Sequence, residues 1–186
     1  MNGQEKSTLI VLAAGSGSRM KSKVAKQYML LAGRPVLWYS LKAAEDSAII
    51  DNCILVTGAE DIAYVKEQIV ERYGFHKVSS IVAGGAERYD SVHHALQELK
   101  KQREETGCAG GYVFIHDGAR PLLTEEIIKR CYETVQTDRA CVAGMPVKDT
   151  IKIVDEAGYA VQTPDMMSTV KNTHRCNIQV TFKSEC

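Results

Sequence analysis

Acidic residues are missing from a long N-terminal stretch of this sequence. No Asp or Glu occurs between Lys6 and Ala44, although the whole chain has 23 acidic and 23 basic residues and no net charge. Within this stretch, residues 9–26 run from an apolar segment through two glycines to several closely spaced cations. Glycine lets backbone N–H groups approach phosphate oxygens, and lysine and arginine supply the opposite charge. We therefore expect this stretch to meet an anion.

Further absences narrow the class of protein. The 186 residues contain no run of about 20 apolar residues, so no membrane partner is expected, and the N-terminus lacks the apolar core of a signal peptide. Six cysteines are scattered without a C-x-x-C pair, which favours free thiols in a reducing cytoplasm over disulfides or a zinc site. Zero net charge argues against a general nucleic-acid binder. We expect a cytoplasmic globular protein with one principal domain.

Apolar runs alternate with segments of helical period along most of the chain. Strands are expected at residues 8–13, 53–57, 78–82, 112–115 and 140–145. Helices are expected at residues 36–45, 61–73, 91–101 and 124–136, with a polar surface loop at 100–111. Such alternation predicts an α/β fold, with a mostly parallel sheet covered by helices on both faces. Ligands of such sheets bind at the carboxyl ends of the strands.

A β-hairpin is predicted near the end of this pattern. Residues 150–154 and 159–163 are interpreted as two short strands joined by the turn sequence Asp-Glu-Ala-Gly. An isolated two-stranded hairpin is marginally stable in water. We therefore expect it to pack against another surface, such as a second subunit.

The glycine loop after the first strand has two interpretations. Residues 13–20, AAGSGSRM, differ from the dinucleotide fingerprint because Met20 stands where its last glycine should be, and no GK[ST] follows as in a Walker A loop. A tight strand-to-helix turn is the simpler interpretation. Arg19 and Lys26 favour a phosphate site, because two cations beside a glycine loop can hold a triphosphate and stabilise charge as a phosphoryl bond breaks.

Two more loops carry polar residues at strand ends. Asp117 closely follows the strand at 112–115, where an aspartate can ligate Mg²⁺; alternatively it caps a turn and pairs with Arg120. In the loop at 84–91, paired glycines allow close backbone approach, and Arg88 and Ser91 can hydrogen-bond a base or phosphate; alternatively this is an ordinary loop with a helix N-cap. The adjacent His93 and His94 have no other histidine or cysteine at metal-ligand spacing, so we interpret them as solvent-exposed helix residues.

Five motifs in order make the chain resemble the 2-C-methyl-D-erythritol 4-phosphate cytidylyltransferases of the non-mevalonate isoprenoid pathway. They are LAAGSGSRM, KQY at 26–28, GGAERYDSV, HDGARP and PVKDT at 146–150, and they span roughly residues 8–164. The resemblance implies a Rossmann-like nucleotidyltransferase sheet over residues 1–165. It also implies that the hairpin, at about 147–163, is the arm of a homodimer.

The resemblance implies a reaction and a role for each matching residue. The substrate phosphate of 2-C-methyl-D-erythritol 4-phosphate would attack the α-phosphorus of CTP in line, releasing pyrophosphate. Arg19 and Lys26 match the catalytic cations, Asp117 matches a ligand of Mg²⁺, and Arg120 and Thr150 match substrate-binding positions, with Thr150 reaching the partner subunit's substrate. The nucleotide-binding positions match Ala13, Ala14, Gly15, Gly17, Gly85, Arg88, Ser91, Asp117 and Ala119.

The chain departs from the family pattern in two places. Ala25 replaces a proline before the KQY lysine. After Asp165, Met166 stands where an arginine is expected, and the TPQ segment, a helix and a late catalytic lysine have no counterpart. Residues 166–186 lack clear periodicity, so we interpret them as a truncated or altered, poorly packed tail and not a separate domain. Loss of a charged contact at a phosphoryl-transfer site costs about 3 kcal/mol, which predicts strongly reduced turnover with CTP binding partly retained.

Three alternatives compete with this interpretation. Ribitol-5-phosphate cytidylyltransferases share the fold and the CTP chemistry, but the HDGARP and PVKDT motifs favour methylerythritol phosphate as the substrate. A non-catalytic CTP-binding fragment is favoured by the tail, but Arg19, Lys26 and Asp117 argue against it. A dinucleotide reductase is disfavoured by Met20.

Overall fold

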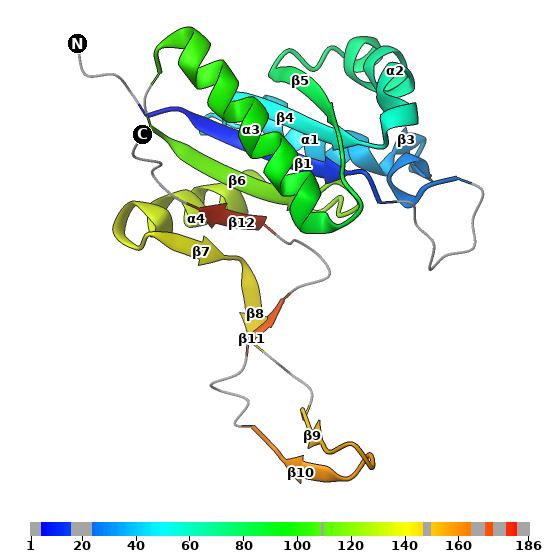
Figure 1. The fold of residues 1–186 in the computed structure, drawn as a ribbon, viewed down its shortest axis with the longest axis vertical. Coiled ribbons are helices and arrows are strands. Elements are labelled where there is room, and N and C mark those ends of the chain that lie inside the picture. The colour runs from blue at the N-terminus through cyan, green and yellow to red at the C-terminus, as the bar shows by residue number, and fades with distance from the viewer. Residues whose placement is uncertain are drawn as a thin grey trace.

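The computed structural model describes residues 5–15, 24–108, 110–146, 150–164, 170–172 and 178–181. Its centre is a six-stranded sheet (Figure 1). In spatial order the strands are β5 (Val78–Ala83), β4 (Asn52–Thr57), β1 (Ser7–Ala13), β6 (Tyr112–Asp117), β12 (Ile178–Thr181) and β7 (Ala140–Val142). The first four are parallel to one another, and β12 runs antiparallel to both of its neighbours. The predicted mostly parallel α/β sheet is confirmed.

Helices cover both faces of this sheet (Figure 1). One face packs against α3 (Arg88–Thr106). The other packs against α1 (Val36–Asp46), α4 (Glu125–Thr137) and a helical run that contains α2 (Ile62–Val65) and the π-helix η4 (Lys66–Glu71). Within the described residues, no helix is both long enough and apolar enough to cross a bilayer.

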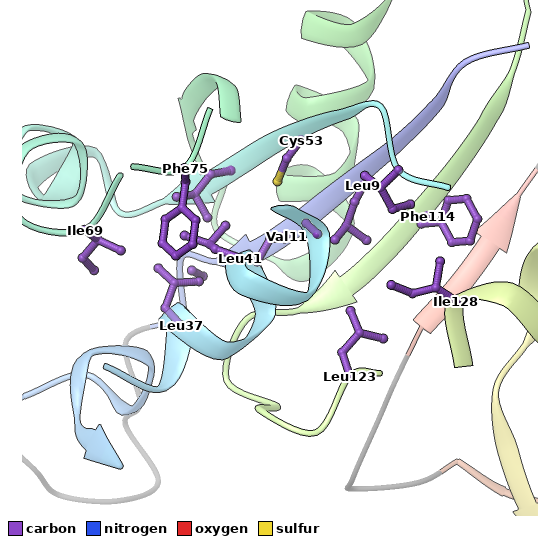
Figure 2. Close-up of a cluster of buried hydrophobic side chains, with 14 of the residues drawn as sticks. Leu9, Val11, Leu37, Leu41, Cys53, Ile69, Phe75, Phe114, Leu123 and Ile128 are labelled. Atoms are coloured by element: carbon purple, nitrogen blue, oxygen red, sulfur yellow. The ribbon is translucent and has the colours of Figure 1, made fainter. Parts of the chain in front are cut away.

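The two faces of the sheet build separate clusters of buried side chains. Leu9 and Val11 of β1 join the cluster beneath α1 and α4, whereas Ile10 joins the cluster beneath α3. This division follows from the pleat of a strand, which points successive side chains to opposite faces. Figure 2 shows the first cluster, where Leu41 of α1 lies over the sheet and Phe114 belongs to β6. Each fully buried side chain of this size contributes about 1.5–3 kcal/mol.

Helix α3 is longer than predicted, and the predicted loop at 100–111 is wrong for its first half. Glu87 and Asp90 form a capping box that starts the helix at Arg88, and Gly107, with φ of 64°, ends it. The polar residues before Gly107 form the solvated face of the helix, with i,i+4 ion pairs such as Lys100–Glu104 at 3.8 Å. Polarity was therefore a sign of exposure and not of a loop.

Two other predicted elements are subdivided. The predicted helix at 61–73 is helical but contains the π-helical turn η4, and Gly74 follows it with φ of +67°. The predicted strand at 140–145 is split into β7, which joins the sheet, and β8 (Gly144–Pro146), which leaves it to pair with β11 (Val170–Asn172).

Short elements lie on either side of α1 and β4. Before α1 come η2 (Lys26–Tyr28) and the strand pair β2 (Leu30–Leu31) and β3 (Arg34–Pro35). After β4 comes η3 (Ala59–Asp61).

The predicted hairpin is present. β9 (Ile153–Val154) and β10 (Ala160–Gln162) pair antiparallel, and the N–H of Asp155 donates to the carbonyl of Tyr159 at 2.9 Å. The apolar side chains of this hairpin are exposed by 45–75%: Ile153, Val154, Tyr159 and Val161. Its role as a dimer arm stays a prediction.

The expectation of a poorly packed tail is wrong for residues 178–181. This segment is β12, which pairs with β6 on one side and with β7 on the other. Ile178-Gln179-Val180-Thr181 alternates in polarity, but four residues are too few to be recognised as a strand within a polar sequence. Residues 165–169, 173–177 and 182–186 lie outside the described part of the chain.

The buried core predicts that Leu41 and Leu122 contribute very differently to the free energy of unfolding. Leu41→Ala, at a side chain that is 1% exposed, is expected to lower the free energy of unfolding by about 2–5 kcal/mol, because it leaves a cavity beneath α1. Leu122→Ala, at a side chain that is 55% exposed, should cost roughly 0.5 kcal/mol or less. Urea denaturation of both variants tests this, and equal losses would contradict the described core.

Candidate active site

An open cleft of about 1000 Å³ lies at the carboxyl edge of the parallel strands. Loops that follow β1, β5 and β6 form its walls, together with η2. Its lining residues are Leu12, Ala13, Ala14, Gly15, Lys26, Gln27, Gly85, Ala86, Glu87, Arg88, Ser91, Asp117, Ala119 and Arg120. The position is the one that the sheet topology predicts for a ligand.

Most of the residues predicted from the sequence come together here. Those that line the cleft are Ala13, Ala14, Gly15, Lys26, Gly85, Arg88, Ser91, Asp117, Ala119 and Arg120. Gly17 and Arg19 lie outside the described residues. Thr150 is exposed, near the hairpin, and is not among the residues that line the cleft. Its predicted role involves a second subunit and stays a prediction.

The loops after β1 and β5 are in direct contact. A Cβ added at Gly84 would clash with the Cβ of Ala14 and lie 2.9 Å from Oγ of Ser91. Only glycine fits so close an approach. Ser91 is not the N-cap of α3; its hydroxyl accepts a hydrogen bond from the N–H of Gly85 at 3.1 Å. Both loops are thus held as one wall of the cleft.

Asp117 is held between two arginines. Nε and Nη2 of Arg88 each lie 3.2 Å from its Oδ1, and Nε of Arg120 lies 2.8 Å from its Oδ2. The backbone N–H of Arg120 also donates to the carbonyl of Asp117 at 3.0 Å, so the turn interpretation describes this geometry correctly. The pairs tie the start of α3 to the end of β6 across the cleft.

The same carboxylate decides whether a magnesium ion fits. No group of three or more metal-ligating side chains occurs among the described residues. Mg²⁺ in nucleotide sites is often bound by one or two carboxylates, with water and substrate phosphates as its other ligands. Asp117, 23% exposed and lining the cleft, suits such an ion once it gives up part of its pairing with Arg88 or Arg120.

The 3₁₀ turn η2 brings Lys26 to the cleft. Ala25 before it adopts φ of −62°, the value that a proline ring would impose, so the alanine preserves the geometry expected of the family's proline. The hydroxyl of Tyr28 donates to Oδ2 of Asp61 at 3.1 Å. Burial and the nearby Asp61 carboxylate raise the pKa of Tyr28, so its phenol stays protonated and this anchor persists at neutral pH.

The histidines and cysteines of the described residues do not line the cleft. His93 and His94 are exposed on α3, as predicted, and His116 is buried with its Nε2 3.1 Å from the carbonyl of Arg120. The cysteines described are free thiols, and burial raises the pKa of Cys53 to about 12. A buried thiol of this kind is unreactive, which is consistent with a role in the core.

Comparison with known proteins identifies the family. A family model of 2-C-methyl-D-erythritol 4-phosphate cytidylyltransferase matches residues 7–173. The chain belongs to this family. It is 51% identical over 158 residues to the cytidylyltransferase of that name from Lachnospira eligens, and 49% identical over 161 residues to that from Lachnoclostridium phytofermentans. These matches cover 85% and 87% of this chain, but only 66% and 65% of the two relatives.

Solved structures of the cytidylyltransferase family have the same fold. The crystal structure of 4-diphosphocytidyl-2C-methyl-D-erythritol synthase from Anaerococcus prevotii matches with a TM-score of 0.77 and 28% identity, over 96% of this chain and 70% of that one. The cytidylyltransferase structure from Thermus thermophilus, at 23% identity and a TM-score of 0.64, supports the fold alone; it matches 97% of this chain and 71% of its own. The family resemblance inferred from the five motifs is confirmed.

Four cleft residues were missed by sequence reasoning: Leu12, Gln27, Ala86 and Glu87. Leu12 adjoins Ala13 at the end of β1, and Ala86 and Glu87 lie between Gly85 and Arg88 in the loop after β5. Gln27 was within the KQY motif, but nothing in the sequence indicated that its side chain turns inward to the glycine loop.

The arginine pairs predict an unusual effect of removing Asp117. Asp117→Ala should strengthen metal-free binding of inorganic tripolyphosphate by about 1 kcal/mol, roughly fivefold, because Arg88 and Arg120 lose their shared counter-charge. Added Mg²⁺ should no longer improve binding. Calorimetry at low and high salt tests this.

Asp46→Ala is the matched control, since it removes the partner of Lys42 on α1, and neither residue is among those that line the cleft. It should leave tripolyphosphate affinity unchanged. Weaker metal-free binding by Asp117→Ala than by the unaltered protein would contradict the described charge arrangement.

Proposed function

We propose that this chain transfers a cytidylyl group from CTP to 2-C-methyl-D-erythritol 4-phosphate in isoprenoid precursor synthesis. The observation that carries the proposal is the convergence of four family motifs on one cleft, at the strand ends where nucleotides bind. A phosphate oxygen of the substrate attacks the α-phosphorus of CTP, the bond between the α-phosphorus and the bridging oxygen breaks, and pyrophosphate leaves. Because the attacking phosphate is already anionic, no general base is required.

The residues of the cleft suit the charge changes of this reaction. Backbone N–H groups of Ala14 and Gly15 would donate to phosphate oxygens, and Lys26 would neutralise charge that develops as pyrophosphate leaves. Arg19, by its family position, supplies a second cation. Among the described lining residues, Lys26, Arg88 and Arg120 outnumber the carboxylates of Glu87 and Asp117 by one.

One excess positive charge in the lining is too little to neutralise the phosphates of both substrates, which supports a divalent metal ion as cofactor. A nucleoside triphosphate and a sugar phosphate bring several negative charges into the same cleft. Mg²⁺, when bound, would neutralise phosphate charge and orient the triphosphate, and Asp117 would hold it.

The chemistry of the lining supports direct transfer without a covalent intermediate. Ser91 is the one hydroxyl-bearing residue among the described lining residues, and it is engaged with the N–H of Gly85 and the carbonyl of Glu87. An activated nucleophile would need a base beside it. In-line attack by the substrate phosphate requires neither group.

We also propose a cytoplasmic homodimer. Reduced cysteines among the described residues support the location. The exposed apolar side chains of the β9–β10 hairpin support burial against a second copy, and Thr150 near it would then contribute to the partner's site. The chain spans about two thirds of the length of its curated relatives, so the whole reaction is assigned here as a proposal.

Release of pyrophosphate tests the proposed reaction. With Mg²⁺, CTP and 2-C-methyl-D-erythritol 4-phosphate, we expect release of pyrophosphate that requires both substrates. Lys26→Met should lower kcat by about 10²–10³-fold, because it removes a cation from the developing charge. Lys42→Met, at an exposed lysine of α1, is the matched control and should have no effect.

Two results would overturn the assignment. Faster release with ribitol 5-phosphate would replace the substrate, while leaving the nucleotide chemistry intact. CTP binding by calorimetry, without release on either polyol phosphate, would make the chain a nucleotide-binding protein and not a transferase.

A further inference from the structure

Gln27 is a buried side chain that holds the glycine loop from within. It is 4% exposed, and its Nε2 donates to two backbone carbonyls, that of Ala13 at 2.6 Å and that of Gly15 at 3.0 Å. These carbonyls lie on either side of Ala14, at the point where β1 becomes the loop. One side-chain amide therefore fixes two peptide groups of the wall that lines the cleft.

The direction of these carbonyls matters for an anion. A carbonyl oxygen carries partial negative charge and repels phosphate, whereas a backbone N–H attracts it. Each of the two carbonyls that accept from Gln27 has its oxygen engaged by an N–H donor, which offsets the partial negative charge that a phosphate would meet. Without the amide, each would need another donor, because buried backbone carbonyls are nearly always hydrogen-bonded.

The turn that carries Gln27 is itself firmly placed. The N–H of Tyr28 donates to the carbonyl of Ala25 at 2.9 Å, and the hydroxyl of Tyr28 donates to Asp61. The neighbouring Lys26 lines the cleft. The three residues 26–28 thus divide their contacts among the cleft, the glycine loop and the segment after β4.

We propose that Gln27 is a positioning residue for phosphate recognition. It orients the peptide groups from Ala13 to Gly15 so that the loop accepts the triphosphate, and it keeps that loop in register with Lys26. This inference rests on the proposed use of the cleft for CTP. It assigns Gln27 no contact with the reacting atoms.

The affinities for CTP, inorganic tripolyphosphate and cytidine distinguish a role of Gln27 in phosphate recognition from a general effect on protein stability. Gln27→Met keeps the length of the side chain and removes both donors. For this variant we expect about tenfold or greater loss of affinity for CTP and for inorganic tripolyphosphate. A loss of this size is expected when both hydrogen bonds of a buried side-chain amide are removed. Affinity for cytidine, which has no phosphate, should change less than about twofold, because no phosphate contact is lost.

Gln102→Met is the matched control. Nε2 of Gln102 donates to Ser80 at 3.1 Å and to Glu98 at 2.9 Å, and Gln102 does not line the active-site cleft. Its substitution should leave the affinities for all three probes unchanged. Equal weakening of cytidine and tripolyphosphate by Gln27→Met would show a merely structural role, and unchanged tripolyphosphate affinity would also overturn the proposal.

A second variant keeps the test decisive if Gln27→Met does not fold. Gln27→Asn shortens the amide by one methylene, so it can reach one carbonyl at most, and we expect an intermediate, phosphate-specific loss of affinity. Affinity for tripolyphosphate equal to that of the unaltered protein would overturn the proposal. If the unaltered protein binds tripolyphosphate without preferring CTP, the proposed function fails, and the phosphate-specific effect of Gln27 is still measured.

Discussion

The parallel pairing of β1 with β4 and β6 is the constraint on which the site depends. Ala13 lies opposite Thr57, Thr57 lies opposite Ala83, and Leu12 lies opposite Asp117. The strands therefore end at one level, and the loops that follow them meet. A one-residue slip would also exchange the two faces of each strand and bury the wrong side chains. The same register that separates the two apolar clusters thus assembles the cleft.

Within the cleft, two polar arrangements control where charge is exposed. Gln27 donates hydrogen bonds to the carbonyls of Ala13 and Gly15, whereas Asp117 pairs with Arg88 and Arg120. Both act on the balance between attraction and repulsion of phosphate. In this account, nucleotide binding exchanges protein–protein ion pairs for protein–phosphate and metal–phosphate contacts. Selectivity then comes from how these groups are placed, since their net charge is small.

The sequence predicted those features that depend on local pattern. The apolar run of β1 and the helical periods of α1 and α4 are local signals, and the five motifs indicated most of the residues of the cleft. Features that depend on distant partners were missed. Gln27 donates hydrogen bonds to residues that lie 12 and 14 positions earlier in the chain. Strand β12 forms because it pairs with β6 on one side and β7 on the other. Neither relation has a signature in a single sequence.

A crystal structure of the complex with CTP and Mg²⁺ would show whether the large cleft is the nucleotide site. We expect the triphosphate against the backbone of Ala14 and Gly15, with Lys26 near its phosphates and the nucleotide between the loops after β1 and β5. A smaller pocket of about 260 Å³, lined in part by Lys6 and Arg103, lies at the opposite edge of the sheet. Nucleotide bound there, with the larger cleft empty, would show that the motifs at the strand ends do not form the nucleotide site.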